Sequence, residues 1–329
     1  MPADPDMVSF HADGAALIAT RSKGTPPPYD STIVRADASG GPWALVYETD
    51  AMFMVDRVAN GRVGFIEYRA PYQGGGAYSN DFVVLDLASG VKTEIDRFAL
   101  SAATYRGGGG GPRRPVGAIV LGPDHVAWTR LVEGSGGSIT GELRIASLAD
   151  PAEQQLVATS SEWIRPLDID AERLVYVLGG RTEDALHVRD IATGADRVLL
   201  TGAVGDTVRG VIPDFDQAAV SGDWAVWLTD PKNFASKGQA LNVRTGERRD
   251  LETGGSSCYG VSAGTRYFAW GCGKSSDAAA PPVLVIDAKT LEPLATLPSG
   301  IGVGVDATGD GLIWFNVNGS LRTVTLFRP

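Results

Sequence analysis

Arginine and aromatic residues gather in the first half of the chain, and they are the side chains best suited to binding chemistry. Guanidinium groups pair with carboxylates through two parallel hydrogen bonds, and aromatic rings stack on sugars and extended peptides. We therefore predict a binding surface that includes Arg69, Tyr72, Tyr78, Tyr105, Arg106, Arg113, Arg114, Trp163, Arg165 and, from the second half, Tyr259.

A tyrosine beside an arginine could also catalyse a reaction. In a polysaccharide lyase, a tyrosine can carry the proton while an arginine neutralises a uronate carboxylate. The candidate pairs combine Tyr72, Tyr78, Tyr105 or Tyr259 with Arg106, Arg113 or Arg165. A carbohydrate-active enzyme, either such a lyase or a glycoside hydrolase, is therefore the alternative to a binding protein, and no catalytic residue is assigned.

Other motifs carry less chemistry. The segment 260–264 reads Gly-Val-Ser-Ala-Gly, but a nucleophile elbow needs a helix after it, and a strand is predicted there instead. Asp168, Asp214 and Asp216 are weak candidates for a Ca²⁺ site, since carboxylate oxygens are the ligands of that ion. We expect no resident cofactor, with Ca²⁺ as the single exception worth testing.

The two cysteines, Cys258 and Cys272, are equally distant from Thr265 in the sequence. If a hairpin turns at Thr265, the cysteines face each other on paired strands, at a separation that suits a disulfide. The alternative is a pair of buried thiols. A disulfide implies an oxidising compartment, so we expect a periplasmic or secreted protein. Its leader would be absent from this chain, because the first residues have neither a basic nor an apolar region.

The elements that position these residues are short β-strands. Runs with a large aromatic residue, such as 125–129, 223–227 and 266–270, recur every few dozen residues. A second series of strands follows these runs, usually with an Asp and then a Ser/Thr-Gly or Lys-Thr turn, as at 83–90, 186–194 and 283–290. Four short strands per repeat predict a β-propeller.

The predicted fold is all-β, with one propeller domain over residues 1–329. We expect seven blades, of which six have four strands and the seventh is partial, and six blades are the alternative. Strands are lettered a to d from the inside of each blade to the outside. The predicted blades cover about 8–50, 51–100, 112–159, 162–202, 211–254, 256–298 and 300–329.

The repeat resembles those of TolB-type and WD-like bacterial propellers. The resemblance is carried by the Asp13-Gly14 turn and by strands of the form Val-x-Asp-x-x-Ser/Thr-Gly, as at 83–90. It implies an exported protein that binds peptides or proteins through its channel. Related blades also occur beside peptidase domains and in carbohydrate-active enzymes, so the fold does not decide the function.

Topology predicts which face carries the site. The a–b and c–d turns lie on one face, which we call the turn face, and the b–c and d–a connections lie on the other, the long-loop face. The long connections 21–31, 69–80, 132–140, 229–239, 271–282 and 101–115 all fall on the long-loop face. Because long loops on a rigid scaffold commonly build binding sites, we predict the site on that face, near the channel.

Composition narrows the partners. The net charge of −10 argues against nucleic acid as the main partner, because phosphates require clustered Lys and Arg. No apolar run approaches the length that spans a membrane. The sequence favours an exported binding or scaffold propeller for a protein, peptide or glycan over an enzyme, and it leaves the oligomeric state open.

Overall fold

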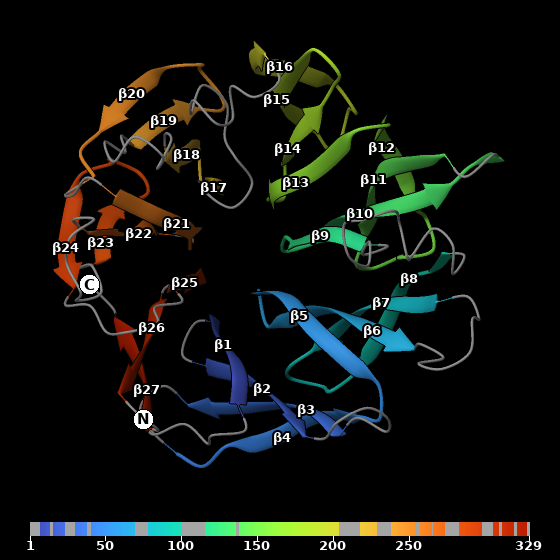
Figure 1. Cartoon of the computed structure of the whole chain (residues 1–329), viewed down its shortest axis with the longest axis vertical. Coiled ribbons are helices and arrows are strands. Elements are labelled where there is room, and N and C mark those ends of the chain that lie inside the picture. Colours follow the sequence, from blue (N-terminus) through green and yellow to red (C-terminus); the bar gives the residue numbers. More distant parts are fainter. Residues whose placement is uncertain are drawn as a thin grey trace.

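The chain folds into a ring of antiparallel β-sheets. The computed structural model describes the following residues: 7–13, 16–23, 30–37, 41–69, 78–100, 116–135, 138–203, 218–228, 238–253, 257–264, 266–273, 283–297, 305–308, 311–318 and 321–327. The described strands form six four-stranded sheets and one three-stranded sheet (Figure 1). The predicted all-β propeller is confirmed.

The first three blades are simple meanders in which consecutive strands pair. Blade one contains β1 (Met7–Asp13), β2 (Ala16–Lys23), β3 (Asp30–Asp37) and β4 (Ala44–Thr49). Blade two contains β5 (Met52–Ala59), β6 (Arg62–Arg69), β7 (Tyr78–Asp86) and β8 (Lys92–Leu100). Blade three contains β9 (Val116–Leu121), β10 (His125–Glu133), β11 (Ile139–Ser147) and β12 (Gln155–Ser160).

The remaining blades repeat the same order. Blade four contains β13 (Trp163–Ile169), β14 (Arg173–Gly179), β15 (Glu183–Asp190) and β16 (Asp196–Ala203). Blade five contains β17 (Ala218–Ser221), β18 (Trp224–Leu228), β19 (Gly238–Asn242) and β20 (Arg248–Leu251). Blade six contains β21 (Ser257–Ala263), β22 (Tyr267–Gly273), β23 (Val283–Asp287) and β24 (Pro293–Leu297). The three-stranded sheet contains β25 (Val305–Thr308), β26 (Gly311–Asn318) and β27 (Leu321–Phe327).

The ring closes through the three-stranded sheet. Its inner strand β25 contacts β21 of blade six on one side and β1 of blade one on the other (Figure 1). The first strand of each sheet lies innermost and the last lies at the rim, so that the sheets stand around a common axis.

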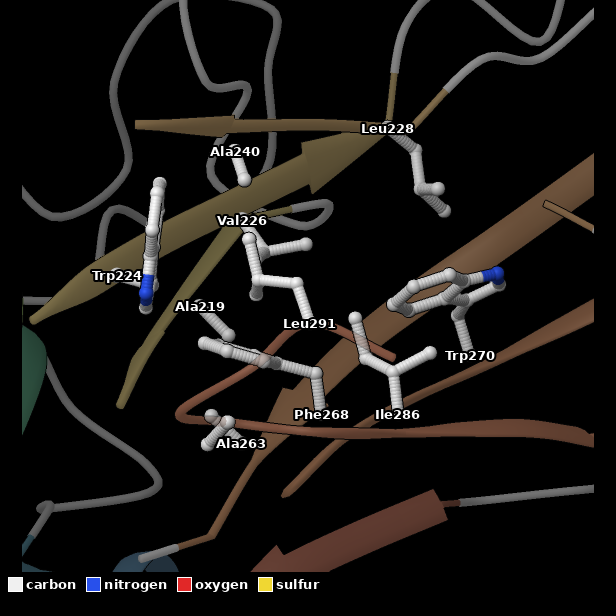
Figure 2. Packing of buried hydrophobic residues seen from close by; sticks show 11 residues of the cluster. Ala219, Trp224, Val226, Leu228, Ala240, Ala263, Phe268, Trp270, Ile286 and Leu291 are labelled. Carbon is white, nitrogen blue, oxygen red and sulfur yellow. The ribbon is translucent and has the colours of Figure 1, made fainter. Parts of the chain in front are cut away.

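The cores lie between blades. Trp270 and Phe268 of blade six pack with Trp224 and Val226 of blade five (Figure 2). Other buried clusters join blades one and two, two and three, three and four, and four and five. The recurring tryptophans Trp128, Trp227 and Trp270 are at most 1% exposed. They hold neighbouring blades together.

The c–d turns show why the Asp-containing repeat folds locally. The Oδ1 atom of Asp86 accepts hydrogen bonds from the backbone nitrogens of Ala88 and Ser89 and from the Ser89 hydroxyl. These bonds hold the pKa of Asp86 below its ordinary value. Gly90 then adopts a φ of 70°, which glycine takes without steric cost. Asp190 and Thr193 form the same turn in blade four.

The predicted hairpin around Thr265 has the expected register. Cys258 pairs with Cys272 across β21 and β22. The side chains of both cysteines lie outside what the structure describes, so the disulfide stays a prediction. Within the described residues, the structure contains no helix of the length and apolar character that crossing a bilayer requires.

Candidate functional site: the channel mouth

A cavity of about 300 Å³ opens where the inner strands meet the a–b turns. Its lining comes from the ends of β1, β5, β9, β13, β17 and β21, and from the residues that follow them. Six blades therefore contribute to one hollow at the turn-face end of the channel. We call this hollow the channel mouth.

Two charged side chains enter the channel mouth directly after irregularities in their strands. The pairing of β5 with β6 shifts between Val55 and Arg57, and the pairing of β13 with β14 shifts between Pro166 and Asp168. Such a bulge inserts one extra residue and re-aims the side chains beside it. The proline is tolerated because β13 is an edge strand of its sheet.

Arg57 and Asp168 form an open ion pair across the channel mouth. Arg57 belongs to blade two and Asp168 to blade four, so the pair connects two blades that are separated in the ring by blade three. The Nη2 atom of Arg57 lies 4.0 Å from the Oδ1 atom of Asp168, and the two side chains are 30% and 24% exposed. This separation exceeds hydrogen-bond length, so each group keeps capacity for another partner.

Burial raises the pKa of Asp168 to about 6, against an ordinary value of 3.8. The nearby charge of Asp170 acts in the same direction. The positive charge of Arg57, a hydrogen bond from the Ile169 backbone nitrogen and the positive charge of Arg173 oppose the increase. Removal from water outweighs all three, because Arg57 stays too far away to neutralise the carboxylate.

The other described carboxylates of the channel mouth have close partners. Asp170 accepts hydrogen bonds from the backbone nitrogens of Glu172 and Arg173, and from the Arg173 Nε atom at 2.8 Å. Asp13 accepts from the backbone nitrogen of Gly61 in blade two. Asp168 is therefore the least compensated carboxylate among the described lining residues.

Hydrogen bonds between blades fix the rim of the channel mouth. They link blades one and two, two and three, four and five, and five and six, through the pairs Asp13–Gly61, Arg62–Pro123, Arg173–Gly222 and Ser221–Gly264. Arg173 also binds Asp223 of blade five at 2.8 Å. A rim held in this way is formed before any ligand arrives, which lowers the entropy cost of binding.

Three of the predicted site residues lie on β13. Asp168 reaches the channel mouth, whereas Trp163 begins the strand, about 16 Å away at about 3.3 Å per residue. A methyl group on Gly179 would overlap the indole of Trp163, so the ring lies directly on the backbone of β14. This contact supports a packing role for Trp163. Arg165 lies between the two and is partly exposed.

The structure does not test the remaining predicted site residues. Arg69, Tyr78 and Tyr259 belong to β6, β7 and β21, but their side chains are not described. Outside the described residues lie Tyr72, Tyr105, Arg106, Arg113, Arg114, Asp214 and Asp216. The channel mouth is on the turn face, opposite the predicted long-loop site, and the long-loop site stays a prediction.

Sequence reasoning missed Arg57. The available signal was the pair of charged residues Asp56 and Arg57 in the otherwise apolar innermost strand of a blade, just before a tight turn at Asn60 and Gly61. The Ca²⁺ hypothesis gains no support from the described part of the chain, where no group of three or more His, Cys, Asp or Glu side chains could hold an ion. Two of its three candidates lie outside that part.

Comparisons with known proteins agree on the fold. No family model matches the chain, and no curated protein matches it. The β-propeller domain of the trilobed protease from Pyrococcus furiosus is 11% identical, with a TM-score of 0.54, over 84% of this chain and 82% of that chain. An oligogalacturonate lyase in complex with manganese is 10% identical, with a TM-score of 0.58, over 99% of this chain and 92% of that one.

A prolyl endopeptidase is also similar, at 12% identity and a TM-score of 0.63, over 98% of this chain and 50% of that one. The chain thus spans about half the length of that enzyme. TolB from Acinetobacter baumannii matches with a TM-score of 0.47, which carries no argument. At these identities the similarities establish a β-propeller and leave its function undecided.

Proposed function

We propose that this chain is a binding propeller that docks a protein or peptide partner on its turn face, with the channel mouth as the anchoring pocket. One observation carries the proposal. A preformed cavity collects the inner-strand ends of six blades and presents an arginine and an aspartate that do not satisfy each other. Convergent polar groups in a partly apolar hollow are typical of ligand sites.

The lining favours a peptide over a glycan. Its apolar part is aliphatic, with Val58, Leu121, Ile169 and Val220, and no aromatic residue is among the described residues that line it. Sugars are commonly held on aromatic rings. A cavity of about 300 Å³ accommodates one or two side chains, so the rest of the partner would lie on the surrounding turns.

A displayed peptide library, selected on the wild-type protein, tests the proposal. Pro123 is exposed at the edge of the cavity, and Pro123→Trp would cover the opening. Leu156→Trp adds a comparable side chain to the outer strand of the same blade, where Leu156 is 49% exposed. Selected peptides should bind the wild type and Leu156→Trp but not Pro123→Trp. Equal binding to all three would overturn the proposal.

A lyase at the long-loop face remains the second hypothesis from the sequence. This hypothesis predicts that the protein cleaves a uronate polymer, and the absorbance of the unsaturated product measures the reaction. Loss of turnover in Tyr105→Phe or Arg106→Gln would assign the site, and no turnover of acidic glycans would remove the hypothesis.

We further propose an extracytoplasmic location, which rests on the opposed register of Cys258 and Cys272. Alkylation of the denatured protein from its native source, followed by mass measurement, decides the thiol state. A disulfide leaves both cysteines unmodified until reductant is added. Two freely alkylated cysteines would contradict the proposal.

A further inference from the structure

We infer that the channel mouth binds a basic side chain of the partner, a guanidinium or an ammonium, on the carboxylate of Asp168, while Arg57 donates to a carbonyl oxygen beside that side chain. This inference rests on the proposed function, because it names the chemistry of the group that enters the same pocket.

The charge of the lining selects a cation. Asp13, Asp168 and Asp170 face a single described arginine, Arg57, in the cavity. Arg173 already neutralises Asp170 at 2.8 Å, whereas Asp168 has only Arg57 at 4.0 Å. A guanidinium that approaches to ordinary bonding distance would make a shorter and stronger charge-assisted pair than the one present.

The geometry keeps this pair open. Arg57 comes from β5 and Asp168 from β13, and blade three separates their sheets. The hydrogen bonds between Arg62 and Pro123 and between Arg173 and Gly222 hold the strand ends of the rim in place. The distance between Arg57 and Asp168 is therefore set by the ring of blades. A ligand that binds both groups can form the close hydrogen bonds that the two side chains do not form with each other.

Protonation follows from the same surroundings. The charged groups around Asp168 are Arg57 from blade two, Asp170 on its own turn and Arg173 from β14. With a pKa of about 6, the carboxylate is ionised at pH 7.5 and about nine-tenths protonated at pH 5. Affinity for a cation should fall about tenfold between these two values.

The test uses four acetylated, amidated tripeptides, Gly-X-Gly, in which X is arginine, lysine, citrulline or norleucine. Their binding is followed by displacement of a fluorescent peptide selected from the library. Asp168→Asn removes the charge and keeps the shape of the side chain. Glu183→Gln is the matched control, because Glu183 is exposed on β15 of the same blade.

We expect the arginine and lysine peptides to displace the probe, and the citrulline and norleucine peptides to fail. Asp168→Asn should weaken the basic peptides at least tenfold and abolish their pH dependence, while Glu183→Gln behaves as wild type. Equal displacement by citrulline, or unchanged binding to Asp168→Asn, would overturn the inference. If Pro123→Trp still blocks the selected peptides in that case, the proposed function stands; if it does not, both fall.

Discussion

Two arginine–aspartate pairs in this molecule have opposite surroundings. Between blades two and three, Asp96 accepts hydrogen bonds from the Trp128 Nε1 atom at 2.9 Å and from the Arg130 Nη1 atom at 3.3 Å. The channel-mouth pair of Arg57 and Asp168 is 4.0 Å apart, and no other charged residue that the structure describes lies within bonding distance of Asp168.

This difference distinguishes a pair that stabilises the fold from a pair that can still bind a ligand. Arg130 also binds Glu142, which in turn binds Arg144, so the pair between the blades belongs to a network whose members satisfy one another. Buried charges stabilise a fold only when they are paired in this way. A carboxylate that the fold leaves poorly compensated lowers stability, which is the exchange of stability for binding that the proposed function implies.

The largest effect is expected from breaking the satisfied pair. Asp96→Ala leaves the buried indole nitrogen of Trp128 without its acceptor and removes one of the two carboxylates that bind Arg130. It should lower the free energy of unfolding by about 3–5 kcal/mol. Urea denaturation measures this change. Asp96→Asn keeps an acceptor for Trp128 and should lose less, and a loss below about 1 kcal/mol in Asp96→Ala would contradict the assignment.

Asp168→Asn should change the free energy of unfolding in the opposite direction and stabilise the fold. Because the folded-state pKa of Asp168 is about 6 and the ordinary value is 3.8, the folded protein binds this proton more tightly than the unfolded chain. Ionisation therefore destabilises the fold as the pH rises from about 4 to 6, and the cost is complete above pH 6. A difference of about two pKa units corresponds to about 3 kcal/mol.

The variant should accordingly be more stable than the wild type at pH 7.5 and equally stable near pH 3.5. Urea denaturation at the two pH values tests this directly. Glu183→Gln should show no such divergence. A variant that is less stable than the wild type at pH 7.5 would mean that Asp168 supports the fold, and the contrast between the two pairs would be lost.

Gly179→Ala tests whether Trp163 packs against its own blade. A methyl group at this position would overlap the indole ring, and overpacking of this kind costs about 1–3 kcal/mol. Thermal unfolding measures the loss. Trp163→Leu combined with Gly179→Ala should recover part of it, because the smaller side chain makes room. Additive losses in the double variant would show that the two residues do not touch.

Arg244→Ala should have the smallest effect. Arg244 binds Asp223 at 2.7 Å and Glu172 at 2.9 Å, but its side chain is 54% exposed. Exposed pairs are weakened by solvent and salt, so the melting temperature should not change measurably. Arg173→Ala is the comparison, because Arg173 is 10% exposed and binds Asp170 and Asp223 at the rim. If the two variants are equally destabilised, burial does not decide the strength of these pairs.

The sequence was sufficient for the fold because the propeller repeats its local signals. The run that contains Trp128 and the turn that begins at Asp86 are each recognisable within ten residues, and both have counterparts in other blades. The register of Cys258 with Cys272 followed from the symmetry of one hairpin. Such features depend on neighbours in the sequence, so no knowledge of the ring is needed.

The channel mouth could not be predicted in the same way. Arg57 and Asp168 lie far apart in the sequence, and they meet only because the ring of blades brings the inner strands of blades two and four to one cavity. Their orientation depends on one-residue shifts in β5 and β13, which leave no clear signal in the residue types. Asp168 was predicted as a ligand for an ion, and its partnership with Arg57 emerged from the structure.

Hydrogen–deuterium exchange on the protein with and without a selected peptide tests the location of the site most directly. The account predicts slower exchange at the inner-strand ends, around 57–60, 168–170 and 220–222, and no such protection in Pro123→Trp. Protection confined to the long connections 69–80 and 101–115 would place the partner on the long-loop face and contradict the account.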